Sequence, residues 1–520
     1  MGHSSTLLLR LALIVAVALT QGCTAFHPGE RTPSHTLPPP AQGPLVHATR
    51  AALGNRQQND QSGFYLLDDG LSAFVARVSL IETARASLDL QYYIFSDDTT
   101  GRIIISRLLE AADRGVRVRV LVDDLGTRVD NPLVATLHDH PNIQIRLFNP
   151  VKARGGPLRL LEMATTFGRT NHRMHNKLML ADSLVMIAGG RNLGDEYFAN
   201  THLDFQDVDV LTTGPVVQAG RQSFDDYWNS QAALPVDRVL DADDADQSLA
   251  EMRQALQAFL IEQRDSQFVD ALRGSSLGRK LVAGEIPLEW GTATLYADPP
   301  DKALAHTGVP RSEYLLNDLK EILDSAGQRL QISSAYFVPG KRGVALFRDK
   351  EAEGVAVSIL TNSLSTTDVA IVHSGYSRYR KPLLESGVEL WELRAEAGQR
   401  QRMRWFQGES RASLHAKTFV IDHDRSFIGS VNLDGRSLIQ NTEVGLLIES
   451  EALNRQLSQL FDRWVASDSA WRLSLNDKNK LQWQATDSGE AVIHEHDPET
   501  SRWQRFRVWL LSWLPIEAQI

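Results

Sequence analysis

Apolar and polar residues alternate along this chain in an order that occurs twice. The first set is a strand-like stretch, a helical stretch and a second alternating strand, at Ser87–Phe95, Arg102–Arg114 and Val116–Asp123. The same order returns about 240 residues later, at Arg329–Phe337, Arg342–Glu353 and Val355–Asn362. A strand, a helix and a strand in short succession predict a right-handed crossover within a mixed or parallel sheet that carries helices on its faces.

A shorter aromatic and acidic element also repeats, at Phe224–Trp228 and Phe461–Trp464. Between the two halves the chain is acidic at Asp241–Asp246 and has a helical pattern at Ala250–Glu262, which places the boundary near residues 235–290. We therefore predict two similar α/β lobes that face each other, each a mixed sheet flanked by helices. The predicted order is lobe 1 at 51–235, a helical segment at 236–290, lobe 2 at 291–470 and a C-terminal tail at 471–520.

The N-terminus has the pattern of an export signal. Arg10 precedes the apolar run Leu11–Leu19, and a short polar stretch leads to Cys23, the single cysteine of the chain. This arrangement favours a lipoprotein signal at residues 1–22 with lipidation at Cys23, followed by a Pro-rich tether at 23–50. An uncleaved N-terminal anchor and a buried lone thiol are the alternatives. Because no other apolar run approaches 18 residues, we expect the rest of the chain to be a soluble body beside a membrane.

Composition narrows the classes of function. The chain has 54 Lys and Arg against 64 Asp and Glu, a net charge of −10. This balance argues against a protein that holds nucleic acid mainly by surrounding it with positive charge, although it allows a local basic pocket. The single cysteine excludes an intramolecular disulfide and a Cys-rich metal site. With 520 residues, of which 42% are hydrophobic and 23% charged, the chain is typical of a folded protein of about two to four domains.

The strongest chemical signal is a motif that occurs once in each half: His, one residue, Lys, four residues, Asp. The two copies are His175, Lys177 and Asp182, and His415, Lys417 and Asp422. Chance predicts at most about 0.04 copies in a chain of this composition, so two copies at corresponding places of a repeat indicate function.

Strand geometry divides the residues of each motif. Residues i and i+2 of a strand point to one face, so the His and the Lys of each motif project together. Asp182 and Asp422 have the opposite parity, and we expect a structural role for them at the strand end. Each motif runs on to small residues and an asparagine; these are Gly189, Gly190 and Asn192, and Gly429, Ser430 and Asn432. Glycine permits close backbone approach and asparagine offers an amide donor, so the motifs predict a pocket for a phosphodiester that needs no metal.

The paired motifs with their Gly-Gly or Gly-Ser and Asn extensions resemble those of the phospholipase D superfamily. The stretch Ile187–Phe198 and the lipoprotein-like start are most similar to the bacterial cardiolipin synthase C subgroup of that superfamily. The resemblance covers roughly residues 60–470. It implies a two-lobed fold with one active site shared at the lobe interface, a covalent phosphohistidine intermediate, and no metal or other cofactor.

The resemblance also implies separate roles for the two histidines. One acts as nucleophile and the other as general acid and then general base; by resemblance, His175 attacks and His415 protonates the leaving alcohol. Each His needs a carboxylate to fix its tautomer, and the repeat offers Asp207 and Glu443 at equivalent places. In the superfamily these partners are crossed between the lobes, which pairs His175 with Glu443 and His415 with Asp207.

Several other residues are more typical of supporting positions. His172 and His373 are expected at the surface or behind the site, and Trp228 and Trp464 in the core. The tail segment Trp503–Pro515 carries three Trp and two Arg, which fits either an element at a membrane interface or a packed C-terminal helix.

These observations favour a phosphatidyltransferase that forms cardiolipin by passing a phosphatidyl group to phosphatidylglycerol. Phosphatidylethanolamine is a second candidate substrate. A hydrolytic phospholipase D that releases phosphatidic acid uses the same catalytic residues and is the alternative. A phosphodiesterase acting on nucleic acid is disfavoured by the acidic charge and the export signal, and a non-catalytic envelope protein would make two intact motifs a coincidence. The expected location is the bacterial cell envelope, anchored to a membrane and facing the periplasm.

Overall fold

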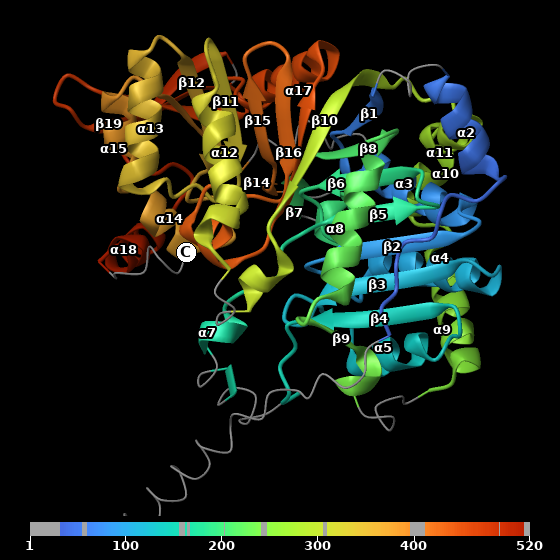
Figure 1. Cartoon of the computed structure of the whole chain (residues 1–520). Helices are drawn as coiled ribbons and strands as arrows, with labels where there is room; N and C mark the ends of the chain where they lie inside the picture. Colours follow the sequence, from blue (N-terminus) through green and yellow to red (C-terminus); the bar gives the residue numbers. More distant parts are fainter. Residues whose placement is uncertain are drawn as a thin grey trace, which may run out of the picture.

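Two lobes lie side by side, each built around a sheet with helices on its faces (Figure 1). The computed structural model describes residues 32–54, 60–154, 162–163, 167–201, 203–240, 247–304, 309–395, 411–487 and 489–513. The predicted signal segment 1–22 and Cys23 lie outside these residues. The predicted α/β fold with two similar lobes is confirmed.

The two sheets have the same strand order. In lobe 1, neighbouring strands are β9 (Ala233–Pro235), β4 (Ile143–Phe148), β3 (Arg117–Asp123), β2 (Ser87–Tyr92), β5 (Leu178–Ala181), β6 (Val185–Gly189), β8 (Asp209–Thr213) and β1 (Ser62–Leu67). In lobe 2 the corresponding order is β18 (Ala470–Leu475), β13 (Glu389–Leu393), β12 (Ala356–Asn362), β11 (Arg329–Ser334), β15 (Lys417–Ile421), β16 (Arg425–Gly429), β17 (Val444–Glu449) and β10 (Glu289–Ala297). Beyond β18 the sheet continues with β19 (Leu481–Asp487) and β20 (Glu490–His494).

The lobes are joined by equivalent strands. β1 pairs antiparallel with β10, with Ser62 opposite Gly291 and Phe64 opposite Glu289, and the rest of β10 pairs with β17. Within the described residues the two sheets therefore form one 18-stranded sheet. Since the joined strands hold the same position in both sheets, the lobes are related by an approximate two-fold rotation.

Helices cover the sheets and connect the strands. In lobe 1 they are α2 (Pro44–Leu53), α3 (Gly70–Thr83), α4 (Thr99–Asp113), α5 (Asn131–His138), α7 (Phe167–Thr170), α8 (Val217–Asn229), α9 (Leu249–Gln263), α10 (Gln267–Gly274) and α11 (Leu277–Ala283). In lobe 2 they are α12 (Leu315–Asp324), α13 (Gly340–Ala352), α14 (Ala370–Tyr376), α15 (Arg380–Glu385), α17 (Glu451–Trp464) and α18 (Arg502–Leu511). Short helical turns lie at Asp195–Tyr197, Val236–Arg238, Pro300–Ala303, Arg311–Glu313 and Arg436–Gln440.

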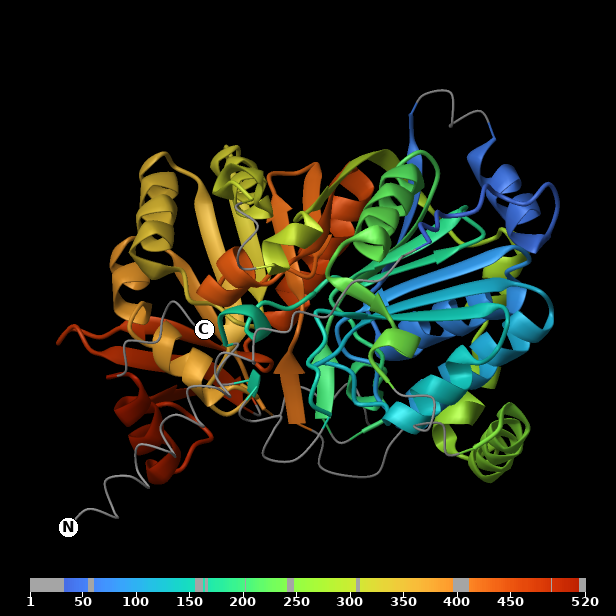
Figure 2. The same cartoon turned by 60° about the horizontal axis from the view of Figure 1, so that its bottom comes forward.

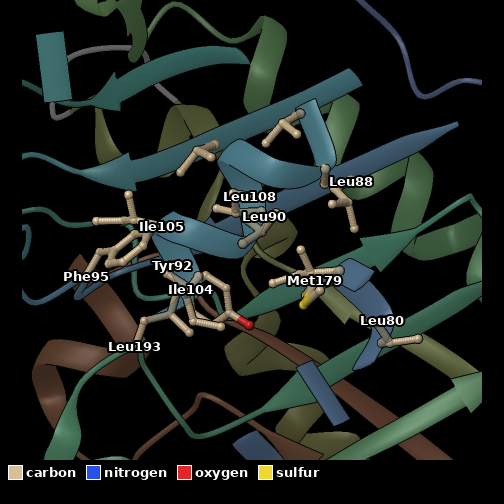
Figure 3. Close-up of a cluster of buried hydrophobic side chains, with 14 of the residues drawn as sticks. Leu80, Leu88, Leu90, Tyr92, Phe95, Ile104, Ile105, Leu108, Met179 and Leu193 are labelled. Atoms are coloured by element: carbon tan, nitrogen blue, oxygen red, sulfur yellow. The ribbon is translucent and has the colours of Figure 1, made fainter. Parts of the chain in front are cut away.

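The repeated strand–helix–strand pattern is the parallel part of each sheet. In lobe 1, β2, β3 and β4 are parallel neighbours, and in lobe 2 β11, β12 and β13 are. Helix α4 makes the crossover from β2 to β3, and it begins where the Asp98 side chain accepts a hydrogen bond from the Gly101 N–H. Apolar side chains of β2 and α4, among them Leu90, Ile104 and Leu108, pack together in the core of lobe 1 (Figure 3).

A second core lies where the lobes meet. It combines residues of α8, such as Phe224 and Trp228, with residues of α17, such as Phe461 and Trp464. The prediction that Trp228 and Trp464 are core residues is confirmed, since their exposed fractions are 0% and 5%. This shared core and the β1–β10 pairing fix the lobes against each other, so groups on their facing edges keep a defined spacing.

Two segments differ from the sequence-based expectation. The stretch from residue 471, expected as a tail, begins with β18, β19 and β20, because Trp471, Leu473 and Trp483 are apolar enough to pack in the core of lobe 2. The described part of the tether, from residue 32, lies against lobe 1, where the Thr36 N–H donates to Asp225. Among the described residues no helix has the length and apolar character that crossing a membrane requires.

Candidate active site

The site forms where segments of one lobe pair with segments of the other. The strand before His415, β14 (Arg411–Leu414), pairs parallel with β7 (Leu203–Gln206) of lobe 1, and a matching bridge joins Met174 to Thr442. The first pairing places His415 beside Asp207, which follows β7. The second places His175 beside Glu443, which follows Thr442. The predicted site at the lobe interface is therefore built by main-chain pairing across the interface (Figure 2 shows β7 and β14 between the lobes).

Each histidine contacts a carboxylate of the opposite lobe. His175 Nδ1 lies 2.8 Å from Glu443 Oε2, and His415 Nδ1 lies 2.6 Å from Asp207 Oδ2. The main chain repeats the crossing, because the His175 N–H donates to the Thr442 carbonyl and the His415 N–H to the Gln206 carbonyl, each at 2.9 Å. A carboxylate on Nδ1 leaves Nε2 as the ring nitrogen that faces a substrate.

The lysines of the two motifs lie beside their histidines. Lys177 Nζ donates to the His175 carbonyl at 2.5 Å, and Lys417 Nζ lies 2.9 Å from His415 Nδ1 and also contacts the His415 carbonyl. Both lysines are 1% exposed, whereas His175 keeps 8% and His415 6%. The charge of Lys417 acts on both His175 and Lys177, so the two amines and two imidazoles lie close together in one buried place, a set that suits an anion such as a phosphodiester.

Asn192 and Asn432 have equivalent partners at the ends of the central strands. The Ile94 N–H donates to Asn192 Oδ1 at 3.1 Å, and the Tyr336 N–H donates to Asn432 Oδ1 at 3.4 Å. With the amide oxygen engaged by the main chain, the NH₂ group of each side chain is oriented as a donor.

Asp182 and Asp422 lie at the far ends of the strands that follow the histidines. Asp182 accepts hydrogen bonds from the N–H groups of Arg85, Ala86 and Ser87, at the start of β2. Asp422 does the same for Gly327, Gln328 and Arg329, at the start of β11. Both carboxylates therefore hold the beginning of a central strand and not the reacting groups.

The two halves of the site differ at one small residue. In lobe 2, Ser430 Oγ donates to Glu443 Oε2 at 2.5 Å and accepts from the Val444 N–H. The equivalent residue in lobe 1 is Gly190, and a Cβ there would lie 2.1 Å from Asp207 Oδ1. The shorter aspartate thus requires glycine in front of it, while the longer glutamate leaves room for a serine.

The two carboxylates also differ electrostatically. Burial raises the pKa of Glu443 to about 7, against the opposing charge of Lys177. Burial acts on Asp207 in the same sense, but the charges of His415 and Lys417 outweigh it and hold its pKa below the usual range. Burial likewise lowers the pKa of Lys417 to about 8.

Burial is also the main cause of the pKa shifts of the other basic groups of the site. It lowers the pKa of His415 to about 4 and that of His175 well below its usual value, with Lys177 and Lys417 adding to the effect on His175. The pKa of Lys177 is lowered in the same way. An anionic phosphodiester placed among these groups would raise their pKa values again, so the site is suited to bind an anion and to gain protons with it.

A buried ion-pair network stands behind Asp207. Arg77 contacts Asp209 at 2.9 Å, and Arg191 contacts Asp209 at 3.4 Å and the Asp207 carbonyl. The Asp209 carboxylate is therefore held by these two arginines. Within the described chain, no group of three or more His, Cys, Asp or Glu could hold a metal ion.

Sequence reasoning missed the aromatic walls of the site. The Tyr93 ring lies 5.2 Å from the His175 ring, and the rings of Tyr197 and Phe205 lie 5.1 Å and 5.0 Å from that of His415. Tyr93 follows the end of β2, and Tyr197 belongs to the stretch Ile187–Phe198 that carries the resemblance. The position of Tyr93 at the carboxyl end of a parallel strand is a signal that could have identified it.

The remaining histidines that stood out in the sequence lie elsewhere. His172 is half-buried, with Nδ1 2.7 Å from the Gly168 carbonyl. His373 is 3% exposed and its Nε2 lies 2.9 Å from Arg380. Cys23, the predicted lipidation site, is outside the described residues.

Comparison with known proteins agrees with this geometry. The family described as "Cardiolipin synthase, PLD-like domain" matches residues 78–228 and 319–465, which is more than half of the chain. Cardiolipin synthase C of Escherichia coli (strain K12) is 41% identical over 467 residues, which cover 89% of this chain and 97% of that protein. Cardiolipin synthase A of Pseudomonas entomophila (strain L48) is 28% identical over 404 residues, covering 76% of this chain and 67% of that protein.

A solved structure has the same fold. The crystal structure of phosphatidylserine synthase from Haemophilus influenzae Rd KW20 superposes with a TM-score of 0.55 at 14% identity, covering 91% of this chain and all of that one. The family match spans both copies of the motif, and the relative at 41% identity spans nearly the whole chain. The chain belongs to the cardiolipin synthase family of the phospholipase D superfamily.

Proposed function

We propose that this protein is a phosphatidyltransferase that forms cardiolipin with phosphatidylglycerol as the acceptor. The observation that carries the proposal is the crossed arrangement of His175 with Glu443 and of His415 with Asp207, beside two buried lysines. This set provides a nucleophile, an acid–base group and positive charge for a phosphodiester, which are the three requirements of phosphatidyl transfer.

In the first step His175 Nε2 attacks the phosphorus of a donor phospholipid. A P–N bond forms and the P–O bond to the head-group alcohol breaks, while His415 Nε2 gives its proton to the leaving oxygen. Lys177 and Lys417 balance the negative charge on the phosphoryl oxygens, and the amides of Asn192 and Asn432 are oriented to donate to them.

In the second step a hydroxyl of phosphatidylglycerol replaces the departed alcohol. His415, now neutral, takes the proton of that hydroxyl, whose oxygen attacks the phosphorus as the P–N bond to His175 breaks. The product is cardiolipin, and His415 is again protonated for the next cycle.

The difference between the two carboxylates supports His175 as the nucleophile. Asp207, with a pKa below its usual range, stays ionised and opposes the effect of burial on His415, so that His415 can gain the proton a general acid requires when the anionic substrate binds. Glu443, whose pKa burial raises to about 7, is a weaker partner for an imidazolium and suits a His175 that attacks in the neutral form.

Two further observations support the choice of a lipid acceptor over water and of a lipid substrate over nucleic acid. Cardiolipin synthases are relatives of this chain at 41% and 28% identity. The net charge of −10 disfavours a nucleic-acid substrate. A hydrolytic phospholipase D would use the same residues with water as the acceptor.

The test of the function is a lipid-product assay. The purified protein is incubated with phosphatidylglycerol and phosphatidylethanolamine, singly and mixed, and the products are separated. Cardiolipin supports the proposal, and phosphatidic acid alone would replace it with the phospholipase. Cleavage of nucleic acid with no lipid product would overturn both.

The test of the histidine roles is covalent trapping. Loss of either His175 or His415 should abolish turnover, because nucleophile and acid act as one unit. With a donor that carries a good leaving group, His415→Ala should still form an adduct on His175. Label on His415 in the His175→Ala protein would reverse the assignment. His47→Ala, at an exposed position on α2, is the matched control and should turn over like wild type.

We also propose that the protein is held in the bacterial cell envelope by acyl chains on Cys23, facing the periplasm. A lipid substrate requires an enzyme at a membrane surface, and the Arg10 and Leu11–Leu19 pattern before Cys23 supports this form of anchoring. The test is fractionation of wild type and Cys23→Ala, with mass spectrometry of the mature N-terminus. Full-length wild type with an unmodified thiol would exclude it.

A further inference from the structure

Exposed apolar side chains are concentrated on helix α18 and the turn that follows it. Among the described residues, eight large hydrophobic side chains are exposed, and five of them lie between residues 503 and 513. These are Trp503 at 65%, Phe506 at 47%, Trp509 at 52%, Leu510 at 56% and Trp513 at 72%. Monomeric proteins rarely leave such a group uncovered without a partner for it.

The exposed side chains of α18 form one face. Positions 503, 506, 510 and 513 recur with helical spacing, and neighbouring rings are in contact, with centroids 5.5 Å apart for Trp503 and Phe506. Val508, on the opposite side, is buried, and α18 packs against α14. The aromatic face is therefore the side of the helix that the protein itself does not cover.

The same helix is basic in an acidic protein. Residues 501–513 contain three arginines and no acidic residue, whereas the whole chain has a net charge of −10. Arg502 and Arg507 are exposed. Tryptophan prefers the boundary between lipid head groups and acyl chains, and arginine there binds anionic head groups.

Helix α18 is fastened to the edge of lobe 2 that carries the site. Glu499, just before the helix, accepts hydrogen bonds from Ser365 Oγ and the Ala395 N–H, which follow β12 and β13. Ala395 also accepts from the Ala412 N–H of β14, the strand that leads into His415. Asn362, at the end of β12, contacts Leu414, next to His415.

Buried ion pairs make this attachment rigid. Asp497 contacts Arg380 at 2.7 Å, and Arg380 contacts Glu392 of β13 at 2.7 Å. His373 of α14 lies 2.9 Å from the same arginine. Figure 2 shows α18 beside α14 on the side of the molecule where β7 and β14 come forward.

We propose that the aromatic face of α18 docks on a bilayer that contains anionic phospholipid, and that it turns the active-site edge toward the lipid. The argument uses the proposed function only in taking the substrate to be a lipid. The face, its charge and its attachment are independent of which reaction the site performs.

The single cysteine of the chain makes the test specific to one position. In a Cys23→Ser background, Leu510→Cys is labelled with an environment-sensitive fluorophore, and Ile261→Cys is the control. Ile261 lies on α9 of lobe 1 and is 55% exposed, against 56% for Leu510. Full-length labelled protein is mixed with phosphatidylcholine vesicles with and without phosphatidylglycerol. Because the label reports its own surroundings, attachment through the N-terminus does not affect the reading.

We expect the label at 510 to enter an apolar environment only with vesicles that contain phosphatidylglycerol, and the label at 261 to stay in water. A label at 510 that stays in water while the protein sediments with those vesicles would overturn the proposal. A shift that needs protein concentration and no vesicles would assign the face to a second copy of the chain and would also overturn it.

A second variant separates docking from chemistry. Trp503→Gln, Trp509→Gln and Trp513→Gln together should lower turnover of vesicle lipid by about tenfold or more while turnover of dispersed short-chain lipid is unchanged. Equal loss on both substrates would contradict docking. Docking in the His175→Ala protein should equal that of wild type. If the label embeds but no cardiolipin forms, the proposed function fails and the docking surface stands. If cardiolipin forms but the label at 510 stays in water, the docking surface fails and the proposed function stands.

Discussion

Replacing Gly190 by alanine should impair general acid–base catalysis by His415 although it removes no polar side chain. The new Cβ would lie 2.1 Å from Asp207 Oδ1 and 2.8 Å from its Cγ, distances that atoms do not adopt. The carboxylate would have to retreat by roughly 1.3 Å to reach an ordinary contact. Asp207 is buried, with Oδ1 bonded to the Val208 N–H at 2.8 Å and Oδ2 to His415 at 2.6 Å, so a retreat breaks one of these bonds.

The expected size of the effect follows from the bond to His415. A hydrogen bond to a charged group is worth about 1.5–3 kcal/mol, which converts to a loss of about 10- to 150-fold in rate. The loss should fall on kcat, with KM little changed, because the bond positions the proton that moves in the transition state and not the lipid.

Cardiolipin formation is measured for Gly190→Ala beside a matched control, Gly274→Ala. Gly274, in α10, has open space around a new Cβ and should behave as wild type. Thermal unfolding of both variants separates a local effect from loss of the fold. The double variant Gly190→Ser with Asp207→Glu rebuilds the arrangement of lobe 2 and should recover part of the activity. A Gly190→Ala enzyme whose kcat stays within about threefold of wild type would refute the reasoning.

Three other properties follow from the same geometry. Activity should survive EDTA, since Lys177 and Lys417 supply the positive charge; full loss that one divalent ion restores would contradict this. The value of kcat/KM, which follows the ionisation of the free enzyme, should rise through about pH 7, as Glu443 ionises and can accept the Nδ1 proton of His175. It should fall above about pH 8, as Lys417 loses its charge. In a pH–rate series Lys417→Arg should lose the alkaline limb, because arginine stays charged. Arg77→Met should lower the free energy of unfolding in urea by about 3–5 kcal/mol, because it removes a partner from the buried carboxylate of Asp209; an unchanged midpoint would show that Arg191 alone suffices.

The sequence was most informative where a pattern occurs twice. The repeated strand–helix–strand order predicted the parallel part of each sheet. The motif predicted that His175 and Lys177 lie together, but the structure places both residues just before β5 and not on a strand. Both inferences depend only on local periodicity, which the chain carries in its own order of residues. The crossed pairing with Glu443 and Asp207 came from the family resemblance, since no local rule brings residues more than 200 positions apart into contact.

Other features depend on three-dimensional context that a single sequence does not carry. Arg119 occupies a polar position of an alternating strand, a pattern that predicts a solvent-facing residue. In the structure it is buried between Asp89 and Asp225. The strands after residue 470 were expected as a tail, because nothing in their composition indicates that they extend the sheet of lobe 2. The need for glycine at 190 is visible only once Asp207, between β7 and β8, lies in front of it.

The joint between β1 and β10 bears on how such a protein could arise. A single lobe would leave that edge strand unpaired, and an open edge is a template for another chain. Because equivalent strands meet there antiparallel, the best partner for one bare lobe is a second copy of itself. In such a homodimer the histidine of each copy would contact the carboxylate of the other, and the two contacts would be identical. Gene duplication and fusion of that lobe yields one chain, in which the two crossings can diverge, as glycine at 190 and serine at 430 have done.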